Sequence, residues 1–477
     1  MTNKLHELLT LLHIACEDHR IIQGISNDSR IVQKDWIFVS EHQSKTKQLQ
    51  YIQEALQKQA VVLCDICLQE ENVYCCENIQ HIQQVLLELY YGYRYQDMTV
   101  IGVTGTNGKT SVAGMITQLL RLHDYKVLRI GTHEVDMDCE KQTIRNTTPD
   151  VYTIVNLLEE AYKKKIRYIV MEVSSHAIDQ NRIALLRYDY LIYTTIQQDH
   201  LDYHLTKTHY RFTKYKLRKY LKSNGKILLY KDADFYHEFT ALLTDGMYVA
   251  IDYEKPIQYI KEDIEFDIHQ SKFTLFGVCF KTSLLGQWNI DNLVQAIVCV
   301  HLLGVCIEDL QNDVKKIQPE KGRMEVLYTE DRYIWIDYAH TPSALQQILR
   351  FANIVKKNRV ICLFGCGGNR DRKKRAMMTQ IACDESDIVV LTTDNPRDES
   401  IQQIFDDMMI GVSGSYKMIE NRGEAIKHCL NIAKKNDIIV IAGKGDEHTQ
   451  EIQGVYYPFH DKTYIWDLLH EEEISWK

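Results

Sequence analysis

The sequence predicts an α/β protein with parallel sheets, organised in three domains. At about 150 residues per domain, the 477-residue chain has room for about three of them. Apolar, strand-like segments alternate with helical segments from about residue 98 to about residue 250, and again from residue 333. This alternation is typical of parallel sheets that are covered by helices on both faces.

The composition narrows the function classes. Hydrophobic residues make up 45% of the chain and charged residues 25%, which is typical of a folded protein. With 56 Lys and Arg against 65 Asp and Glu, the net charge of −9 argues against a protein that coats nucleic acid. No segment approaches 18 uninterrupted apolar residues, so we expect no membrane insertion.

The first expected domain, residues 1–97, carries little recognisable chemistry. Apolar residues near its start recur at helical spacing and predict an amphipathic helix rather than a signal peptide: Leu5, Leu8, Leu9, Leu12 and Ala15. Without a secretory signal, the odd number of 13 cysteines favours a cytoplasmic protein with reduced thiols.

One group of cysteines raises the question of a zinc site. The group contains a CxxC and an adjacent pair: Cys64, Cys67, Cys75 and Cys76. However, AVVLCDICL is typical of a buried strand, and two adjacent cysteines are poor geometry for a second chelating arm. We therefore expect a structural role for these cysteines, since free Cys is often buried.

Strands of the other two expected domains end in polar or glycine-rich turns. In residues 98–325, a buried strand MTVIGVTG runs into a glycine turn and the helix-like SVAGMITQLLRLH, and RYIVMEV and YDYLIYTTI are further strands. In residues 326–477 the strands are YIWIDYAH, VICLFGCGG, IVVLTTDNP and DIIVIAGKG. Ligands of open α/β sheets bind at the carboxyl ends of strands, so we expect the functional residues there.

The strongest motif is GVTGTNGKTS at residues 102–111, between a strand and a helix. Backbone N–H groups of such a turn bind phosphates, while Lys109 adds positive charge and Thr110 can ligate Mg²⁺. The motif departs from the strict P-loop pattern, because Gly102 lies six residues before Gly108 instead of five. Its strand–turn–helix context still predicts a phosphate-binding site.

Three further positions in the central region are less specific. Glu172 ends an apolar strand, where it could hold the Mg²⁺ of a nucleotide or be a solvated strand-end acid. DHLDYH at residues 199–204 has two histidines at i and i+4 but lacks the glutamate of HExxH, which argues against a zinc protease. By its spacing in RFTKYKLRKY, Lys214 is expected to be a solvated helix cation.

The polar turns of the C-terminal region indicate an amino-acid substrate. DYAHTP begins at Asp337, GCGGNRD at Gly365, DNPR at Asp394 and GKGDE at Gly443. Two arginines and a carboxylate at the mouth of one sheet would suit a zwitterion, because Arg binds carboxylates bidentately. By composition alone, surface loops with helix caps are an alternative.

The ordered motifs together resemble those of the Mur ligases, ATP-dependent amide-forming enzymes of peptidoglycan precursor synthesis. They are GVTGTNGKT, NTTP, EVSSHAIDQNR, DHLDYH, GRME, DYAHTP, GCGGNRD, DNPR and GKGDE. Within the family they are most similar to the branch that adds the third residue of the stem peptide. The resemblance implies a smaller α/β N-terminal domain for the UDP end of the substrate. It further implies a central P-loop-type parallel-sheet domain for ATP and a C-terminal Rossmann-like α/β domain for the incoming amino acid.

The resemblance assigns residues to ATP, metal and catalysis. ATP would be bound by the glycine turn and by four residues beyond it: Gly105, Thr106, Asn107, Gly108, Lys109, Thr110, Ser111, Asn289, Asn292, Arg323 and Asp337. The catalytic residues would be Lys109, Glu172, His200 and Lys214. Mg²⁺ would be held by Thr110, Glu172, His200 and Lys214, the last as a carbamate, because CO₂ converts this cation into an anionic ligand.

The resemblance also assigns substrate residues. The UDP-linked muramoyl dipeptide would be bound by Ser29, Thr147, Thr148, Ser174 and Arg182. The incoming meso-diaminopimelate would be bound by Arg370, Asp394, Asn395, Arg397, Gly443 and Glu447. Arg397 would face its distal carboxylate, which lysine lacks, and a buried Arg without that partner would be costly.

The implied activity is ATP-dependent addition of meso-diaminopimelate to UDP-N-acetylmuramoyl-L-Ala-D-Glu through an acyl phosphate. We expect small-molecule substrates, a cytoplasmic location and neither nucleic-acid nor membrane partners. The sequence does not reveal the oligomeric state, for which a monomer is the default expectation.

Several positions depart from the family pattern. GKGDE replaces the usual GKGHE, and Asn369 and Asn421 stand where Asp is usual. DSR at residues 28–30 and WIF at residues 36–38 resemble the UDP-side motif, but SEHQSKTKQLQ replaces the glycine-containing loop expected next. Two alternatives therefore stay open. One is a related ligase for a different amino acid or acceptor. The other is a non-catalytic nucleotide-binding paralogue, against which the presence of all four catalytic residues argues.

Overall fold

The computed structural model describes residues 3–41, 44–91, 97–132, 134–144, 146–197, 199–244, 246–252, 257–329 and 332–475. The chain divides into two compact units. The first comprises Met1–Thr104, Asp124–Ile192 and Thr213–Ile227, and the second Gly105–His123, Tyr193–Phe212 and Leu228–Lys477. The expected domain boundaries after residues 97 and 325 stay predictions. The expected α/β class with parallel sheets is confirmed.

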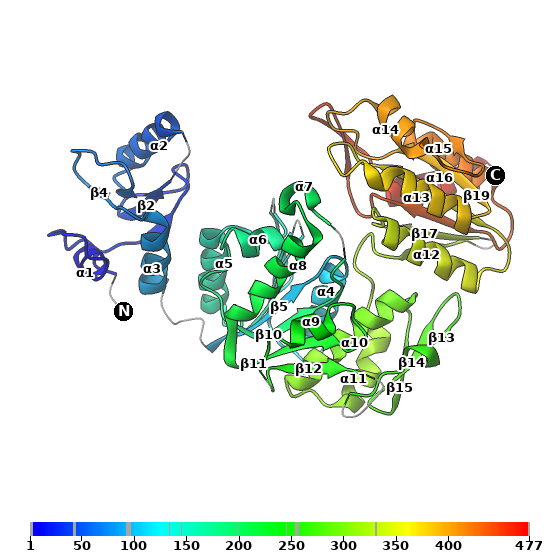
Figure 1. Ribbon diagram of the computed structural model, residues 1–477, viewed down its shortest axis with the longest axis horizontal. Coiled ribbons are helices and arrows are strands. Elements are labelled where there is room, and N and C mark those ends of the chain that lie inside the picture. The colour runs from blue at the N-terminus through cyan, green and yellow to red at the C-terminus, as the bar shows by residue number, and fades with distance from the viewer. Residues whose placement is uncertain are drawn as a thin grey trace. The chain divides into compact units, whose positions relative to one another are not determined.

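The first unit begins with a four-stranded parallel sheet of order β1-β2-β3-β4 (Figure 1). Its strands and helices are β1 Gly24–Ser26, β2 Trp36–Ser40, β3 Val61–Cys64, β4 Val73–Cys75, α1 Leu5–Leu11, α2 Lys45–Gln57 and α3 Ile79–Tyr91. Ile37 packs in a core with the leucines of α1, and the next residue, Phe38, packs in a second core with α2. Successive strand residues thus face opposite sides, and helices cover both. The amphipathic helix expected from Leu5 is confirmed over Leu5–Leu11, whereas Ala15 lies beyond its end and is exposed.

The cysteine group of this sheet contains a disulfide. Cys67 and Cys75 are bonded, with their Cα atoms 5.0 Å apart, and the other cysteines are free. The expectation of reduced thiols is therefore wrong for this pair. The parallel pairing of β3 with β4 places Cys64 opposite Cys75, and the turn after β3 brings Cys67 to the same end. Cys64 is buried, in agreement with a structural role.

The central sheet of the first unit has the strand order β11-β10-β5-β9-β6-β7-β8. The neighbours β5, β9 and β6 are parallel, while β6, β7 and β8 pair antiparallel. The elements are β5 Thr99–Thr104, β6 Val127–Gly131, β7 Glu134–Met137, β8 Glu140–Thr143, α5 Val151–Lys163, β9 Tyr168–Glu172, α6 Ser175–Asp179, β10 Tyr188–Tyr193, a 3-10 turn Lys216–Tyr220 and β11 Leu221–Tyr230. The expected strands MTVIGVTG, RYIVMEV and YDYLIYTTI are confirmed as β5, β9 and β10.

The second unit contains helices and short strands that lie between or after the strands of this sheet in sequence. They are α4 Lys109–Arg121, α7 Leu201–His204, α8 Lys207–Tyr215 (which ends in the first unit), α9 Tyr236–Thr240, β12 Tyr248–Ile251, β13 Glu265–Phe266, β14 Ser271–Leu275, β15 Val278–Thr282, α10 Gln287–Leu302 and α11 Ile307–Asp313, with 3-10 turns at Lys261–Asp263 and Val314–Lys316. Helices α4 and α10 pack against each other, and β13, β14 and β15 form a small antiparallel sheet.

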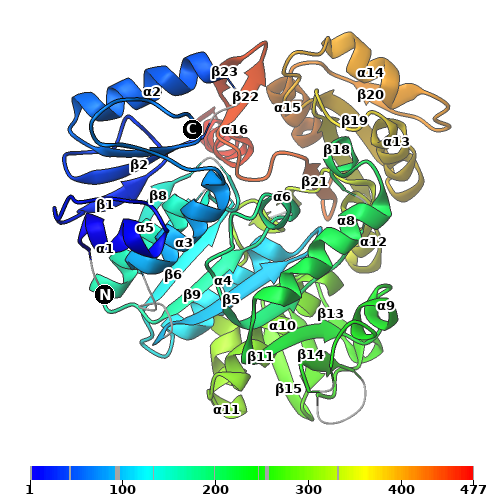
Figure 2. The same ribbon diagram turned by 60° about the vertical axis from the view of Figure 1, so that its left-hand side comes forward.

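The second unit also holds a six-stranded sheet of order β16-β17-β21-β18-β19-β20, parallel except at β16. Its elements are β16 Glu325–Tyr328, β17 Tyr333–Asp337, α12 Pro342–Val355, β18 Val360–Cys366, α13 Lys373–Glu385, β19 Ile388–Thr393, α14 Ile401–Met409, β20 Lys417–Met418, α15 Arg422–Ile432, β21 Ile438–Ala442, β22 Thr449–Ile452, β23 Val455–Pro458 and α16 Asp461–Ser475. Figure 2 shows the sheet with α12 and α13 on one side and α15 and α16 on the other. One apolar core fills each side.

Local sequence explains where the first helix of this sheet begins. The Thr341 hydroxyl accepts a hydrogen bond from the Ala344 N–H (3.3 Å), and Pro342 occupies the first turn. A threonine cap and a proline at the first helical position are both favoured, because that N–H has no partner within the helix.

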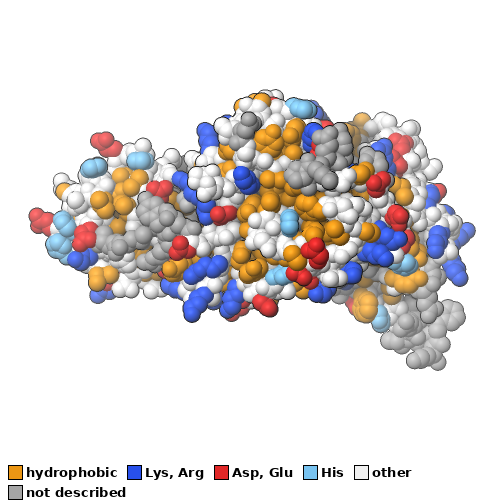
Figure 3. Space-filling view, turned by 90° about the horizontal axis from the view of Figure 1, so that it is seen from below, with side chains coloured by type: hydrophobic (Ala, Val, Ile, Leu, Met, Phe, Trp, Pro, Cys, Tyr) orange, Lys and Arg blue, Asp and Glu red, His pale blue; other side chains and the backbone are white. Residues whose placement is uncertain are grey.

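The surface carries mixed side chains. On the face shown in Figure 3, apolar side chains lie among scattered Lys, Arg, Asp and Glu. Among the helices that the structure describes, none is long and apolar enough to cross a membrane.

A buried ion pair joins the starts of α15 and α16. Arg422 donates to both carboxylate oxygens of Asp461, from Nε at 2.7 Å and from a terminal nitrogen at 2.6 Å. Both side chains are almost fully buried, and the guanidinium also donates to the carbonyl of Ala442. Breaking one side of such a pair leaves an uncompensated buried charge.

We predict that Asp461→Ala lowers the free energy of unfolding by about 3–5 kcal/mol, because Arg422 then stays buried without its anion. The double variant Arg422→Met/Asp461→Ala should recover part of this loss, since it removes the orphaned charge. Urea unfolding followed by tryptophan fluorescence measures both. An unchanged midpoint for the single variant would contradict the prediction.

Candidate active site

The glycine turn after β5 forms a tight loop that continues into α4. Gly108 has a φ of +87°, and a Cβ there would lie 2.5 Å from Oδ1 of Asn292 in α10. A Cβ at Gly105 would lie 1.8 Å from the Thr194 hydroxyl oxygen. Both positions therefore require glycine, because a side chain at either one would collide with a neighbouring residue. Gly108 also requires it because its backbone is in the left-handed region. The Lys109 ammonium donates to the carbonyls of Gly105 and Thr106, each at 2.9 Å, so it lies over its own loop.

The segment after β10 holds this loop in place. The Thr106 hydroxyl lies 3.0 Å from the Tyr210 hydroxyl and donates to the carbonyl of Gln197 at 3.1 Å. The Thr194 hydroxyl donates to the carbonyl of Asn107. These bonds fix the loop that leads into α4, and the N-terminus of a helix after such a loop is where phosphate-binding turns hold an anion.

A cavity of about 530 Å³ lies beside the loop, entirely within the second unit. Seven of the eleven residues predicted for ATP line it: Asn107, Gly108, Ser111, Asn289, Asn292, Arg323 and Asp337. Apolar side chains form another part of its wall, including Trp288, Ile348 and Phe351. The cavity thus combines an anion-binding loop with an apolar surface, which suits a phosphorylated aromatic molecule such as a nucleotide.

Two titratable residues that line the cavity, Asp337 and His340, have shifted pKa values. Burial raises the pKa of Asp337, although the Arg323 charge and the N–H of Met324, which donates at 2.7 Å, act against it. The Arg323 guanidinium lies 4.4 Å from the centre of the Tyr338 ring. Burial lowers the pKa of His340 to about 4, so this imidazole is neutral near pH 7.

His200 lies at the start of α7 beside Asp199. Burial pushes the pKa of Asp199 up, but the charges of His200, His340 and Lys109 and the His200 N–H outweigh it and lower the pKa. The His200 Nε2 lies 3.4 Å from an Asp199 carboxylate oxygen, and about half of the His200 side chain is exposed. His200 therefore has room to bind a further group.

Glu172, in the first unit, is held by the turn after β6. Its carboxylate accepts from the N–H of Thr132 (2.9 Å) and from the Thr132 hydroxyl (3.0 Å), and the side chain is 1% exposed. A Cβ at Gly131 would lie 2.5 Å from a Glu172 carboxylate oxygen, so the glycine makes room for it. The alternative of a solvated strand-end acid is wrong.

Lys214, at the end of α8, is 1% exposed, and its ammonium lies 3.4 Å from the hydroxyl oxygen of Thr104 at the end of β5. The expectation of a solvated helix cation is wrong. The adjacent Thr213 and Tyr215 are buried too, so the last turn of α8 is enclosed on more than one side. Only tertiary packing decides which face of this polar helix is covered.

Four of the five residues predicted for the muramoyl substrate lie together in the first unit. The Thr148 hydroxyl donates to the carbonyl of Glu172 at 2.8 Å and accepts from the N–H of Ser174 at 3.0 Å. Arg182 donates to the carbonyl of Thr148 at 2.9 Å, and the Thr147 hydroxyl lies 3.2 Å from that of Thr132. The fifth, Ser29, is buried beside the N-terminal sheet and donates to Glu54 of α2 at 2.7 Å. Two residues of the replaced UDP-side loop, at positions 42–43, lie outside the described residues.

Residues predicted for the amino acid meet at the carboxyl ends of β18, β19 and β21. Asn395 donates to Glu447 at 2.7 Å, and Asp394 lies against Gly443, where a Cβ would be 2.8 Å from its carboxylate. The Arg397 guanidinium donates to the carbonyl of Gly368 at 2.7 Å. Arg370, which follows Gly368 by two residues, is exposed. Carboxylates, an amide and arginines thus lie close together, an arrangement suited to a zwitterion.

Three side chains in these sites were not singled out by the sequence. Buried Lys444 donates to Glu447 at 2.9 Å, and the Lys374 ammonium donates to the carbonyl of His340. Thr132 holds Glu172, as described above. Lys444 could have been found from its place inside GKGDE, whereas no spacing marks Lys374 or Thr132.

Comparison with known proteins agrees with this geometry. Residues 103–300 match the family model described as the Mur ligase middle domain, and residues 322–445 match the Mur ligase, glutamate ligase domain. The chain belongs to the Mur ligase family. The expected family is thereby confirmed.

Curated relatives in this Mur ligase family match nearly the whole chain. A Fusobacterium nucleatum protein named UDP-N-acetylmuramoyl-L-alanyl-D-glutamate–2,6-diaminopimelate ligase is 36% identical over 462 residues, 93% of each chain. An Aquifex aeolicus protein of the same name is 32% identical over 454 residues, 94% of each chain.

Solved structures share the fold. One titled as a structure of that same 2,6-diaminopimelate ligase has a TM-score of 0.70 at 29% identity and covers 99% of this chain and 100% of its own. The MurF ligase of Thermotoga maritima in complex with ADP has a TM-score of 0.64 at 15% identity, covering 95% and 99% of the two chains. At this identity the second likeness concerns the fold alone.

We predict that Gly108→Ala weakens ATP binding at least tenfold, because the new Cβ meets Asn292 and the backbone must hold a positive φ. Gly277→Ala is the matched control: its φ is +76°, but nothing lies within 4 Å of the added Cβ. Isothermal titration with ATP measures both variants. Equal affinities for the two would show that the close approach to Asn292 is unimportant.

Proposed function

We propose that this Mur ligase joins meso-diaminopimelate to UDP-N-acetylmuramoyl-L-Ala-D-Glu with hydrolysis of ATP to ADP and phosphate. The observation that carries the assignment is the cluster of Asp394, Asn395, Arg397 and Glu447 at the ends of neighbouring parallel strands. In a member of this family, such a cluster offers both an anion and a cation to an amino acid. The two curated relatives named for this reaction, which match over nine-tenths of the chain, support it.

The reaction consists of two displacements. The γ-carboxylate of the D-Glu residue attacks the γ-phosphorus of ATP, the bond to the bridging oxygen breaks, and ADP leaves. An amine of diaminopimelate then attacks the carbonyl carbon of the acyl phosphate. The tetrahedral intermediate loses phosphate, the amine loses a proton, and an amide remains.

We propose that the cavity in the second unit binds ATP. The turn N–H groups and Lys109 would face the phosphates, and the apolar wall that includes Trp288 would face the base. Lys109 would neutralise charge that develops on the transferring phosphoryl group, acting by position and electrostatics. ATP would displace the Lys109 ammonium from the loop carbonyls that it contacts in this structure. A cytoplasmic location follows from the use of ATP.

The proposed metal ligands suit Mg²⁺ in part. Thr110 and Glu172 offer the oxygen ligands that Mg²⁺ prefers, and Glu172 is held in one orientation by Thr132. His200 is a less usual ligand, because imidazole suits softer metals. When bound, Mg²⁺ would offset phosphate charge.

Lys214 fits the proposed carbamate in its burial and its position. The side chain is 1% exposed and its nitrogen lies 3.4 Å from the hydroxyl oxygen of Thr104 at the end of β5, so a carbamate there would offer anionic oxygens inside the protein. The neutral amine would attack CO₂, lose a proton and become an anionic oxygen ligand.

Arg397 supports a substrate with a second carboxylate. Its guanidinium lies 3.3 Å from the Glu451 carboxylate of β22, and its φ is +51°. We propose that Glu451 and the Gly368 carbonyl orient this Arg toward the distal carboxylate of diaminopimelate. Lysine would leave the guanidinium without that partner.

ADP release tests the function. Purified protein is assayed with UDP-N-acetylmuramoyl-L-Ala-D-Glu and ATP, together with diaminopimelate, lysine or no amino acid. We expect release only with diaminopimelate. Equal release in all three reactions would overturn the assignment, and release with a different acceptor alone would favour the related-ligase alternative.

We predict that Lys109→Ala abolishes turnover while the circular dichroism spectrum stays unchanged, because the lysine acts on phosphate and the hydrogen bonds of its ammonium to Gly105 and Thr106 stay within one loop. Lys163→Ala, which changes an exposed lysine of α5, is the control and should keep full activity. Wild-type turnover by Lys109→Ala would contradict the proposed role.

We predict that Arg397→Ala lowers kcat/KM for diaminopimelate at least 100-fold, about 3 kcal/mol by the relation of rate to free energy. Loss of the bidentate carboxylate contact is the reason. Activity with lysine, however low, should fall far less. Steady-state kinetics with both amino acids measures the ratio, and equal losses for the two would show that Arg397 does not select the distal carboxylate.

A further inference from the structure

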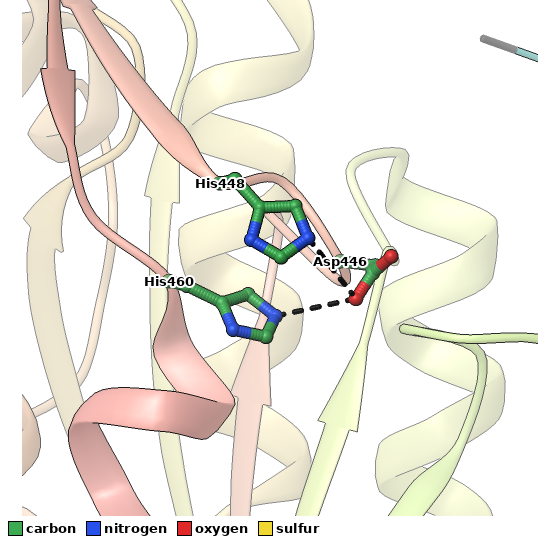
Figure 4. A group of neighbouring side chains, drawn as sticks. All are labelled: Asp446, His448 and His460. Atoms are coloured by element: carbon green, nitrogen blue, oxygen red, sulfur yellow. Dashed lines mark ion pairs between the residues drawn. The ribbon is translucent and has the colours of Figure 1, made fainter. Parts of the chain in front are cut away.

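We infer that Asp446, His448 and His460 form a binding site for a divalent transition-metal ion of the Zn²⁺ class. Asp446 lies in the GKGDE turn after β21, His448 directly before β22, and His460 directly before α16. Their ligand atoms all lie within 4.8 Å of one another. Figure 4 shows both imidazoles directing a ring nitrogen toward the same Asp446 carboxylate.

The separations of these atoms suit tetrahedral coordination. An Asp446 carboxylate oxygen lies 3.2 Å from Nε2 of His460 and 3.8 Å from Nε2 of His448. Zinc bonds of about 2.0–2.2 Å at the tetrahedral angle place neighbouring ligand atoms about 3.3–3.5 Å apart. Small side-chain rotations therefore bring the three atoms onto one ion. A fourth position would stay open to water.

His460 is oriented as a metal ligand. Its Nδ1 lies 2.7 Å from the Thr463 hydroxyl oxygen, and with Nδ1–H donating to that oxygen, Nε2 carries the lone pair. The Nε2 atom is buried and makes no hydrogen bond to any described residue, although it faces the Asp446 carboxylate. A ring whose Nδ1 is held by a hydroxyl while Nε2 points at a carboxylate is an arrangement typical of metal-ligating histidines.

His448 supplies the accessible side of the site. Its side chain is 68% exposed, and its ring centre lies 4.2 Å from that of His460. An ion can therefore reach the cluster from solvent. Two imidazoles and one carboxylate suit Zn²⁺, Co²⁺ or Ni²⁺, whereas Mg²⁺ and Ca²⁺ prefer oxygen ligands alone.

The site is distinct from the residues assigned to the reaction but flanks one of them. Glu447, which accepts hydrogen bonds from Asn395 (2.7 Å) and Lys444 (2.9 Å), lies between Asp446 and His448 in the chain. A bound ion would hold both neighbours of Glu447 and tie the GKGDE turn to the start of α16. We therefore assign the ion a structural role rather than one in the chemistry.

Metal binding to the untagged full-length protein, after treatment with a chelator and its removal, tests the inference. Titration with Co²⁺, followed by visible absorption, should show one equivalent bound with the strong bands of tetrahedral cobalt. Zn²⁺ should displace Co²⁺, and millimolar Mg²⁺ should not. Absence of a bound equivalent, or ready displacement by Mg²⁺, would overturn the inference.

Variants identify the ligands. His448→Ala and His460→Ala should each weaken Co²⁺ binding at least tenfold, and Thr463→Val should weaken it about tenfold through the orientation of His460. His470→Ala, at an exposed histidine of α16, is the matched control and should leave binding unchanged. His448 is exposed, so its variant is informative even if His460→Ala does not fold. Unchanged affinity in His448→Ala, or an equal loss in His470→Ala, would exclude this cluster as the site.

Discussion

The parallel register of the C-terminal sheet is the constraint on which the amino-acid cluster depends. Asp337 pairs with Ala442, Phe364 with the same Ala442, and Cys366 with Thr393. Every polar turn that follows these strands must therefore leave the sheet at one edge. Residues separated by more than 100 positions in sequence meet there because backbone hydrogen bonds align the strand ends.

Two buried arginines in the C-terminal region are each paired with carboxylates. Buried Arg375 donates to Glu399 and Asp407, and buried Arg422 to Asp461. The Arg375 hydrogen bonds lower the pKa of Glu399 to about 2. Such pairs hold the helices beside the site in place, because moving one partner away would leave the other as an unpaired buried charge. The scaffold thereby supplies rigidity, while Lys109 and Arg397 contact backbone carbonyls that a ligand can replace.

The sequence predicted the main strands and the polar residues at their ends. Apolar strands ending in Glu172, Asp337 and Asp394 are recognisable because buried strands need continuous apolar runs and ligand residues follow them. Lys214 was placed wrongly by its spacing, since a polar helix reveals nothing about which face a neighbouring strand covers. The Cys67–Cys75 bond was missed because it depends on the pairing of β3 with β4, which lies outside any local pattern.

By itself the sequence determined the order of strands and helices, the glycine turn before α4 and the family to which the chain belongs. These are local properties: a run of apolar residues, a glycine where φ must be positive, a motif of contiguous residues. Only the tertiary structure decided that Thr132 holds Glu172, that Lys444 is buried beneath Glu447, and that His448 and His460 face Asp446. The contacts of Thr132 with Glu172 and of His460 with Asp446 join segments that are separate in sequence. The burial of Lys444 likewise depends on packing around its turn, which no single segment encodes.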